Sequence, residues 1–203
     1  MKKKLLFAAV LIAGLSICSI ENAAAQRNNA RNDAGVVING HRWATRNVAA
    51  PGTFAATPED PGMFFQWNRS TGHPATGAVS GWDTSYAQGT EWYAANDPCP
   101  RGWRVPTQAE FNSLRAAGTE WTIQNGVPGR TFGTAPNQIF LPAAGWRYNI
   151  DGSLQSAGAV GDYWISQPTG QSSAWNLFFN RASHSVGVPS SRAHAFPVRC
   201  IAR

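Results

Sequence analysis

The chain is poor in several residue patterns, and each shortage excludes a class of protein. Its three cysteines form no Cys-x-x-Cys pair and none has a neighbouring histidine, which disfavours a metal pair or a redox dithiol. No Gly-x-Ser-x-Gly segment occurs, so the nucleophile elbow of an α/β-hydrolase is missing. Lysine is confined to residues 2–4 and the arginines form no run, which argues against a nucleic-acid partner.

The first 25 residues have the pattern of a secretory signal peptide. Lys2–Lys4 precede thirteen apolar or small residues, Leu5–Ile17, a run too short to span a bilayer, and Ala23–Ala25 offer a small-residue cleavage site. We expect cleavage before Gln26 and no transmembrane segment afterwards. A lipoprotein anchored through Cys18 is the alternative, but an isoleucine stands where its signal needs a small residue. The mature chain is then periplasmic, outer-membrane-associated or extracellular.

Removal of residues 1–25 leaves fourteen arginines against ten acidic residues, a small positive balance that requires no special partner. Residues 26–34 are rich in Asn and Arg and predict a flexible leader. Residues 35–203 are long enough for one domain with a sizeable core. Two cysteines remain, Cys99 and Cys200, and in an exported chain they most simply form a disulfide, with a metal pair or a reactive thiol as the alternatives.

Turn and capping signals predict the clearest elements. The pair Asn39-Gly40 predicts a hairpin that joins residues 36–38 to residues 42–45. Thr107 and Glu110 have the spacing of a capping box, which predicts a helix over residues 108–117.

Short aromatic segments predict the remaining strands, and the stretches between them resemble loops. Residues 82–95 are expected to include a short helix, and residues 119–138 are expected to be mostly loop because they contain several glycines and prolines. With short strands, few helices and long loops, the predicted fold class is α+β. The predicted strands cover residues 139–141, 161–166, 174–179, 184–188 and 196–201.

Several segments resemble, in family order, the Fibrobacter succinogenes major paralogous domain, which is common in exported proteins of Bacteroidetes and Fibrobacter. The most specific is Cys99–Phe111, Cys-Pro-Arg-Gly-Trp-Arg-Val-Pro-Thr-Gln-Ala-Glu-Phe, which is similar to the signature C-P-x-G-W-x-x-P-T-x-x-E-W. The resemblance covers residues 35–203. The other matching segments are Gly40–Val48, Phe64–Trp67, Phe140–Arg147, Gly161–Ser166 and Val198–Cys200.

This resemblance implies a C-type-lectin-like fold with two short helices, small twisted antiparallel sheets and long loops. It also implies that a bridge between Cys99 and Cys200 brings the ends of the domain together. The calcium site of such lectins is not expected here, because Ala135-Pro136-Asn137 and Trp175-Asn176-Leu177 lack the carboxylates that calcium needs. We therefore expect no metal and no cofactor.

Aromatic residues beside polar ones are the best candidates for a ligand site. Flat rings next to planar hydrogen-bonding groups suit sugars, although Trp146 and Trp175 lie in apolar runs, which favour a core position. No catalytic residue is assigned, because the four histidines are scattered and no carboxylate pair stands out. The candidate ligand residues are Trp146, Arg147, Tyr148, Asn149, Asp151, Trp175 and Asn176.

Together these observations predict an exported, non-enzymatic binding module of a bacterial envelope. We expect an adhesin-like or glycan-binding role without calcium, with a glycan or a cell-surface protein as the partner. Two alternatives remain: a structural or assembly component, such as a fimbrial subunit, and a polysaccharide-acting hydrolase.

Overall fold

The structure, a computed structural model, describes residues 31–203. The predicted signal peptide and the first residues of the predicted leader lie outside this range. In chain order the elements are β1 (Val36–Ile38), β2 (His41–Asn47), β3 (Phe64–Gln66), β4 (Gly72–His73), the 3-10 helix η1 (Ala94–Asn96), β5 (Trp103–Arg104), α2 (Gln108–Ala116), β6 (Thr119–Gln124), β7 (Val127–Thr134), β8 (Asn137–Pro142), β9 (Trp146–Arg147), β10 (Leu154–Gln155), β11 (Gly161–Pro168), β12 (Ser173–Phe179), β13 (His184–Ser191), β14 (Ala195–Pro197) and β15 (Arg199–Ala202).

The described chain is mostly β-sheet, so the predicted α+β fold class with short helices is wrong. The helix α2 is the only α-helix that lies wholly within residues 31–203. Residues 82–95 form no α-helix; the short η1 begins at Ala94, at their end. The prediction failed because short strands interrupted by glycine and proline lack a clear apolar period, and pairing with distant partners decides their structure.

The hairpin of β6 and β7 is the main element that the sequence reading missed. Asn125 and Gly126 have φ angles of 48° and 82°, which suit the tight turn between the two strands. Gly129, taken as a sign of a loop, lies inside β7, where an added Cβ would come within 2.4 Å of the Leu141 carbonyl oxygen. The glycine is therefore needed for close packing of β7 against β8.

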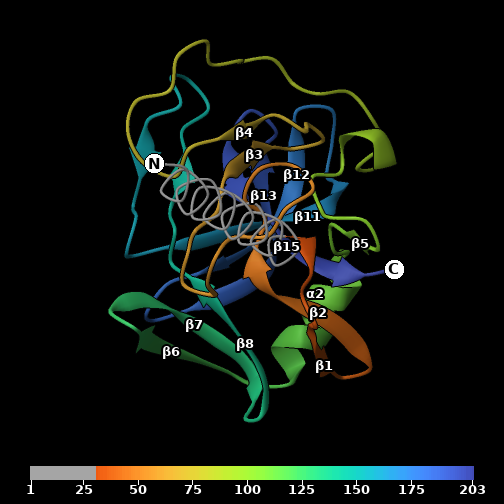
Figure 1. Cartoon of the computed structure of the whole chain (residues 1–203). Coiled ribbons are helices and arrows are strands. Elements are labelled where there is room, and N and C mark those ends of the chain that lie inside the picture. Colours follow the sequence, from red (N-terminus) through yellow and green to blue (C-terminus); the bar gives the residue numbers. More distant parts are fainter. Residues whose placement is uncertain (1–30) are drawn as a thin grey trace, which may run out of the picture.

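Four small antiparallel sheets make up the domain (Figure 1). Their strand orders are β1-β2-β15-β5, β10-β9-β14-β3-β4, β11-β12-β13 and β6-β7-β8. The stretch predicted as one strand over residues 196–201 divides at Val198. Before it, β14 pairs with β3 and β9; after it, β15 pairs with β2 and β5. This stretch therefore joins two of the sheets.

Several predicted elements are confirmed. The hairpin of β1 and β2 turns at Asn39 and Gly40, and β12 pairs with β13 across the turn at residues 180–183. The helix α2 begins with the expected capping box: Thr107 accepts a hydrogen bond from the Glu110 N–H, and the Glu110 side chain accepts one from the Thr107 N–H at 2.7 Å. Each side chain thereby satisfies a backbone donor that the first turn leaves unpaired.

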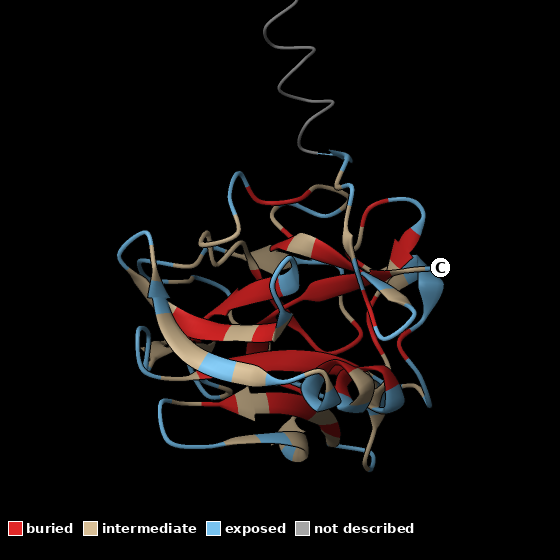
Figure 2. Ribbon diagram, turned by 90° about the horizontal axis from the view of Figure 1, so that it is seen from below, coloured by how far each residue is buried: buried red, intermediate tan, exposed pale blue. Residues whose placement is uncertain are grey.

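Aromatic side chains fill much of the interior, where Figure 2 shows strands coloured as buried. In one core cluster Phe111 and Leu114 of α2 pack against the sheets, and the ring centroid of Trp43 lies 5.1 Å from that of Phe111. In the second cluster the ring centroids of Trp164 and Phe196 lie 4.2 Å apart. Burial of these side chains gives the small sheets their main stabilisation.

A buried arginine connects strands from three sheets. Arg199 of β15 is fully buried and donates to Asn47 Oδ1 from Nε at 3.0 Å and from Nη2 at 2.8 Å, and to backbone carbonyls on β2 and β8. Asn47 Nδ2 in turn donates to the hydroxyl of Tyr163 on β11 at 3.2 Å. Burial lowers the pKa of Arg199 to about 10 and raises that of Tyr163. The guanidinium of Arg199 is therefore hydrogen-bonded inside the core to uncharged amide and carbonyl oxygen atoms.

Both ends of the described chain are attached to the domain. A disulfide joins Cys99 to Cys200, with 6.0 Å between their Cα atoms. Asp33, inside the predicted leader, accepts hydrogen bonds from the backbone N–H groups of Thr45 at 3.0 Å and Arg46 at 3.2 Å. Within residues 31–203, no helix is both long and apolar enough to cross a membrane.

Candidate functional site

Five of the predicted ligand residues lie on or just after β9, with unequal exposure. Trp146 is half-buried against the second core cluster, whereas Tyr148 is 42% exposed. Asn149 and Asp151 belong to the following turn, where Asn149 is half-buried and Asp151 is exposed. Tyr148 and Asp151 are therefore the members of this group that present their side chains most freely to solvent.

Arg147 is fully buried, so a ligand at the surface cannot contact its side chain as predicted. Its guanidinium donates to the carbonyl of Pro74 from Nε at 3.1 Å and to the carbonyls of Gly77 and Gly152 from Nη1, both at 2.9 Å. Burial lowers its pKa. Arg147 thus attaches the loop after β4 to β9.

The other two predicted ligand residues lie on β12, apart from the β9 group. Trp175 is half-buried against the first core cluster, whereas Trp146 belongs to the second. Asn176 is fully buried, and its amide donates to Asp162 Oδ1. Burial raises the pKa of Asp162 to about 7. The hydrogen bond from Asn176 acts in the opposite direction and lowers this pKa. The seven predicted residues therefore form no common surface, and their ligand role stays a prediction.

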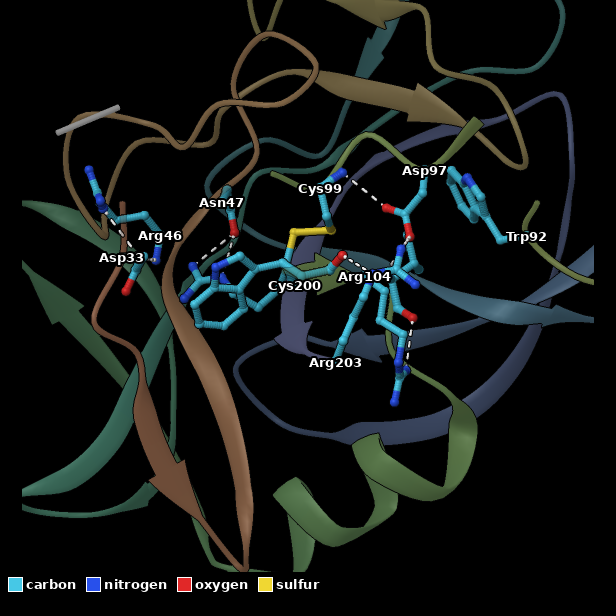
Figure 3. Close-up of a disulfide and its surroundings, with 12 residues drawn as sticks. Asp33, Arg46, Asn47, Trp92, Asp97, Cys99, Arg104, Cys200 and Arg203 are labelled. Carbon is cyan, nitrogen blue, oxygen red and sulfur yellow. Dashed lines mark hydrogen bonds and ion pairs between the residues drawn. A yellow bond between two sulfur atoms is a disulfide. The ribbon is translucent and has the colours of Figure 1, made fainter. Parts of the chain in front are cut away.

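The disulfide is surrounded by charged groups that stabilise the entry to α2 (Figure 3). Arg104 forms an ion pair with Glu110 of α2. Burial raises the pKa of Glu110, but hydrogen bonds from Arg104 and Thr107 outweigh it and hold the pKa below its ordinary value. This region therefore serves the structure.

Asp97 lies beside the disulfide, and together with Glu91 it lines a hollow of about 320 Å³. A pair of carboxylates in one hollow is what a glycosidase requires. Asp97, however, accepts hydrogen bonds from the N–H groups of Cys99 at 3.0 Å and Val105 at 3.2 Å, and lies 3.6 Å from Arg203 Nη2. Burial raises its pKa, and these partners oppose the rise. Its carboxylate is engaged in holding the turn at Cys99.

A different surface has the features of a binding site. The loop between β4 and η1 is yellow to olive in Figure 1, and buried side chains form hydrogen bonds with its backbone. Asn68 donates to the Gln88 carbonyl at 2.8 Å and accepts from the Tyr93 N–H at 2.8 Å. Arg192 donates to the Ala87 carbonyl at 2.6 Å, and its guanidinium carbon lies 4.1 Å from the Trp67 ring centroid. The loop is thereby fixed without regular secondary structure.

Two adjoining hollows open on this loop. One, of about 340 Å³, lies between residues 68–71 and 87–96, and the other, of about 590 Å³, lies between residues 88–93 and 168–171. Gln88 and Tyr93 line both hollows, and the Tyr93 ring is 43% exposed. We call the two hollows and the residues that line them the Tyr93 surface.

The Tyr93 surface carries little net charge. Its hydrogen-bonding groups are largely amides and hydroxyls, among them Ser70, Thr90 and Asn96. Arg69 at its edge forms an ion pair with Asp83 at 2.9 Å, and the buried Arg192 uses its donors on backbone carbonyls. An exposed ring among neutral donors and acceptors suits a polar, uncharged ligand.

Sequence reasoning missed the Tyr93 surface because its parts are far apart in the chain. Residues 68–71, 87–96, 168–171 and 192 meet only after the sheets have assembled. The one local signal was the cluster of aromatic residues over 82–95, of which Trp92 is buried and Tyr93 exposed. The spacing of the aromatic residues in the sequence does not show which of these two side chains is buried and which is exposed.

The fold and site define a small, disulfide-bonded, mostly β domain with a preformed polar loop surface. Within residues 31–203, no three His, Cys, Asp or Glu side chains lie close enough together to hold a metal ion. Comparisons with protein-family models, with curated proteins and with solved structures find no match.

Proposed function

We propose that the chain is an exported, non-enzymatic binding module of a bacterial envelope that binds a glycan at the Tyr93 surface. The observation that carries this proposal is that an exposed tyrosine and an exposed glutamine join two hollows on one fixed loop. A sugar ring offers apolar C–H groups to an aromatic face and hydroxyls to surrounding amides, which is the chemistry that Tyr93 and Gln88 supply.

The fixed loop supports tight binding because a site already in its bound shape loses little conformational entropy when the ligand arrives. The bonds from Asn68 and Arg192 to the loop backbone provide that order. The signal-peptide pattern and the resemblance of Cys99–Phe111 to the Fibrobacter succinogenes major paralogous domain support export and an envelope location, and both rest on the sequence.

The test compares two tyrosines of equal exposure. Tyr93→Ala is expected to weaken binding to a responsive glycan about tenfold, because the ring loses its stacking contact. Tyr148→Ala, at 42% exposure beside β9, is the matched control and is expected to leave binding unchanged. Binding of the purified mature chain is first measured on a broad glycan array with and without EDTA, then by calorimetry for each variant.

Binding is expected to persist in EDTA, because the sequence lacks the carboxylates of a calcium-dependent sugar site. No binding across the array would overturn the proposal. A loss in Tyr148→Ala with Tyr93→Ala unaffected would instead move the site to the residues predicted from the sequence.

A further inference from the structure

A further hollow, of about 550 Å³, lies beside the hairpin of β6 and β7. The hairpin itself is at the lower left in Figure 1. The hairpin contributes Trp121, Ile123 and Pro128, and the opposite side is formed by residues 158–160 and 180–182. Ile123 is 66% exposed, more than any other large apolar side chain in residues 31–203. Together with Trp121 and Pro128, Ile123 gives the hollow an apolar side.

The apolar side of this hollow follows from strand register. Trp121 pairs with Arg130 and Ile123 pairs with Pro128, so the four side chains share one face of the hairpin. Glu120 precedes Trp121 and therefore lies on the opposite face. None of the nine residues around the hollow is an aspartate or a glutamate.

Positive charge gathers at the same place. Arg130 is buried and its Nη2 donates to the carbonyls of Asn180 at 2.9 Å and Arg181 at 3.4 Å, two residues that line the hollow. The Nε of Arg130 has no hydrogen-bond partner among residues 31–203. Arg181 is exposed at the rim and forms no ion pair with the described part of the chain.

A neighbouring histidine responds to this charge. His184 begins β13, directly after the turn that accepts the Arg130 bonds. Burial, Arg130 and Arg115 all lower its pKa. Burial is the largest of these causes, and the two arginines add to it because a positive charge disfavours the protonated imidazole.

We propose that this hollow binds a small amphiphile that has an apolar ring or short acyl body and one anionic head group. The body covers Trp121, Ile123 and Pro128, and the head group lies at the rim beside Arg181, with the positive field of Arg130 behind it. Charge complementarity selects this ligand: an anion gains from both arginines, whereas a cation is repelled. The site is separate from the Tyr93 surface.

Two fluorescent probes with similar bodies test the proposal on the purified mature chain. Anilinonaphthalene sulfonate carries the anionic group, and phenylnaphthylamine lacks it. We expect the sulfonate to bind several-fold more tightly than the neutral probe. Ile123→Ser should weaken the binding of both probes about tenfold, because the aromatic part of each probe loses apolar contact. Arg181→Gln should weaken the sulfonate about threefold and leave the neutral probe unchanged, because an exposed charge contributes modestly.

Matched controls lie on other parts of the surface. Val37→Ser replaces an apolar side chain that is 56% exposed on β1, and Arg101→Gln replaces an exposed arginine near the disulfide. Neither control is expected to change binding. Equal affinity for the two probes would overturn the proposal that the ligand carries an anionic head group. Unchanged binding in Ile123→Ser, or no binding of either probe, would overturn the site. All variants have exposed positions, and their unfolding midpoints verify that they remain folded.

Discussion

The region around the disulfide and the loop over residues 70–96 are ordered in different ways. Around Cys99 and Cys200, paired strands, the capped helix α2 and a covalent bond maintain the structure. The loop contains only β4 and η1, yet buried side chains from outside it donate to its carbonyls. Regular backbone pairing supports the first region, and side-chain hydrogen bonds replace it in the second.

This difference explains why the predicted ligand residue Arg147 is buried, whereas Asn176 is buried on β12, the central strand of its sheet. Arg147 and Asn176 are polar residues next to tryptophans, which is also the appearance of a sugar site. In the structure Arg147 satisfies loop carbonyls and Asn176 bonds to Asp162. A fold with long loops needs such internal donors, because unpaired buried carbonyls are costly.

The largest expected effect comes from the buried cation of the regular region. Arg199→Met should reduce the free energy of unfolding by about 3–5 kcal/mol, because Asn47 Oδ1 and two strand carbonyls lose their donor inside the core. Urea unfolding followed by tryptophan fluorescence measures the change. Arg101→Met, at an exposed position, is the control and should shift stability by less than about 0.5 kcal/mol. Equal small shifts in both variants would contradict a central role for Arg199.

Removal of the disulfide should have the next largest effect. The bond closes a loop with a sequence separation of 101 residues, and Cys99→Ala with Cys200→Ala should cost about 2–4 kcal/mol. Urea unfolding of the double variant measures it, and reduction of the wild-type chain by dithiothreitol should give a similar loss. A wild-type chain with two free thiols by mass measurement would contradict the bridge.

The buried carboxyl of Asp162 should make stability depend on pH. Its pKa of about 7 in the folded chain lies above the ordinary 3.8, so between these values the folded state keeps a proton that the unfolded state has lost. Stability from this group is present below about pH 4 and is lost as pH rises to about 7.

The comparison of wild type with Asp162→Asn isolates this effect. The amide does not titrate, so the difference in unfolding free energy between the two chains should change from pH 4 to pH 8 and then level off. A difference that is constant across this range would show that Asp162 keeps an ordinary pKa.

The smallest global effect is expected in the loop region. Arg147→Met should reduce unfolding free energy by about 1–2 kcal/mol, because the chain segment it holds can separate from β9 while the sheets stay paired. Hydrogen exchange should speed up near residues 74–77 and remain slow in β11 and β12. A uniform acceleration over the whole chain would mean that Arg147 stabilises the core in the same way as Arg199.

Local signals predicted the elements whose causes are local. Asn39-Gly40 and the pair Thr107 and Glu110 correctly located a hairpin and a helix start, because turn conformation and capping depend on a few adjacent residues. The hairpin at Asn125-Gly126 had the same signal but was obscured by Gly129 and its neighbours. Together with the short strands that lack an apolar period, this missed hairpin led to the wrong fold class.

The candidate site was the hardest part to predict. The Tyr93 surface combines segments separated by about a hundred residues, and the exposure of Tyr93 differs from that of Trp92 beside it because of how the loop lies on Asn68. Neither residue type nor spacing contains that information.

By itself the sequence determined the helix start, the first hairpin and the two cysteines available for pairing. The tertiary structure decided which polar side chains are buried, which aromatic rings face solvent and how the four sheets join. The physical reason is range: capping and turns depend on neighbouring residues, whereas burial depends on contacts between residues far apart in the chain.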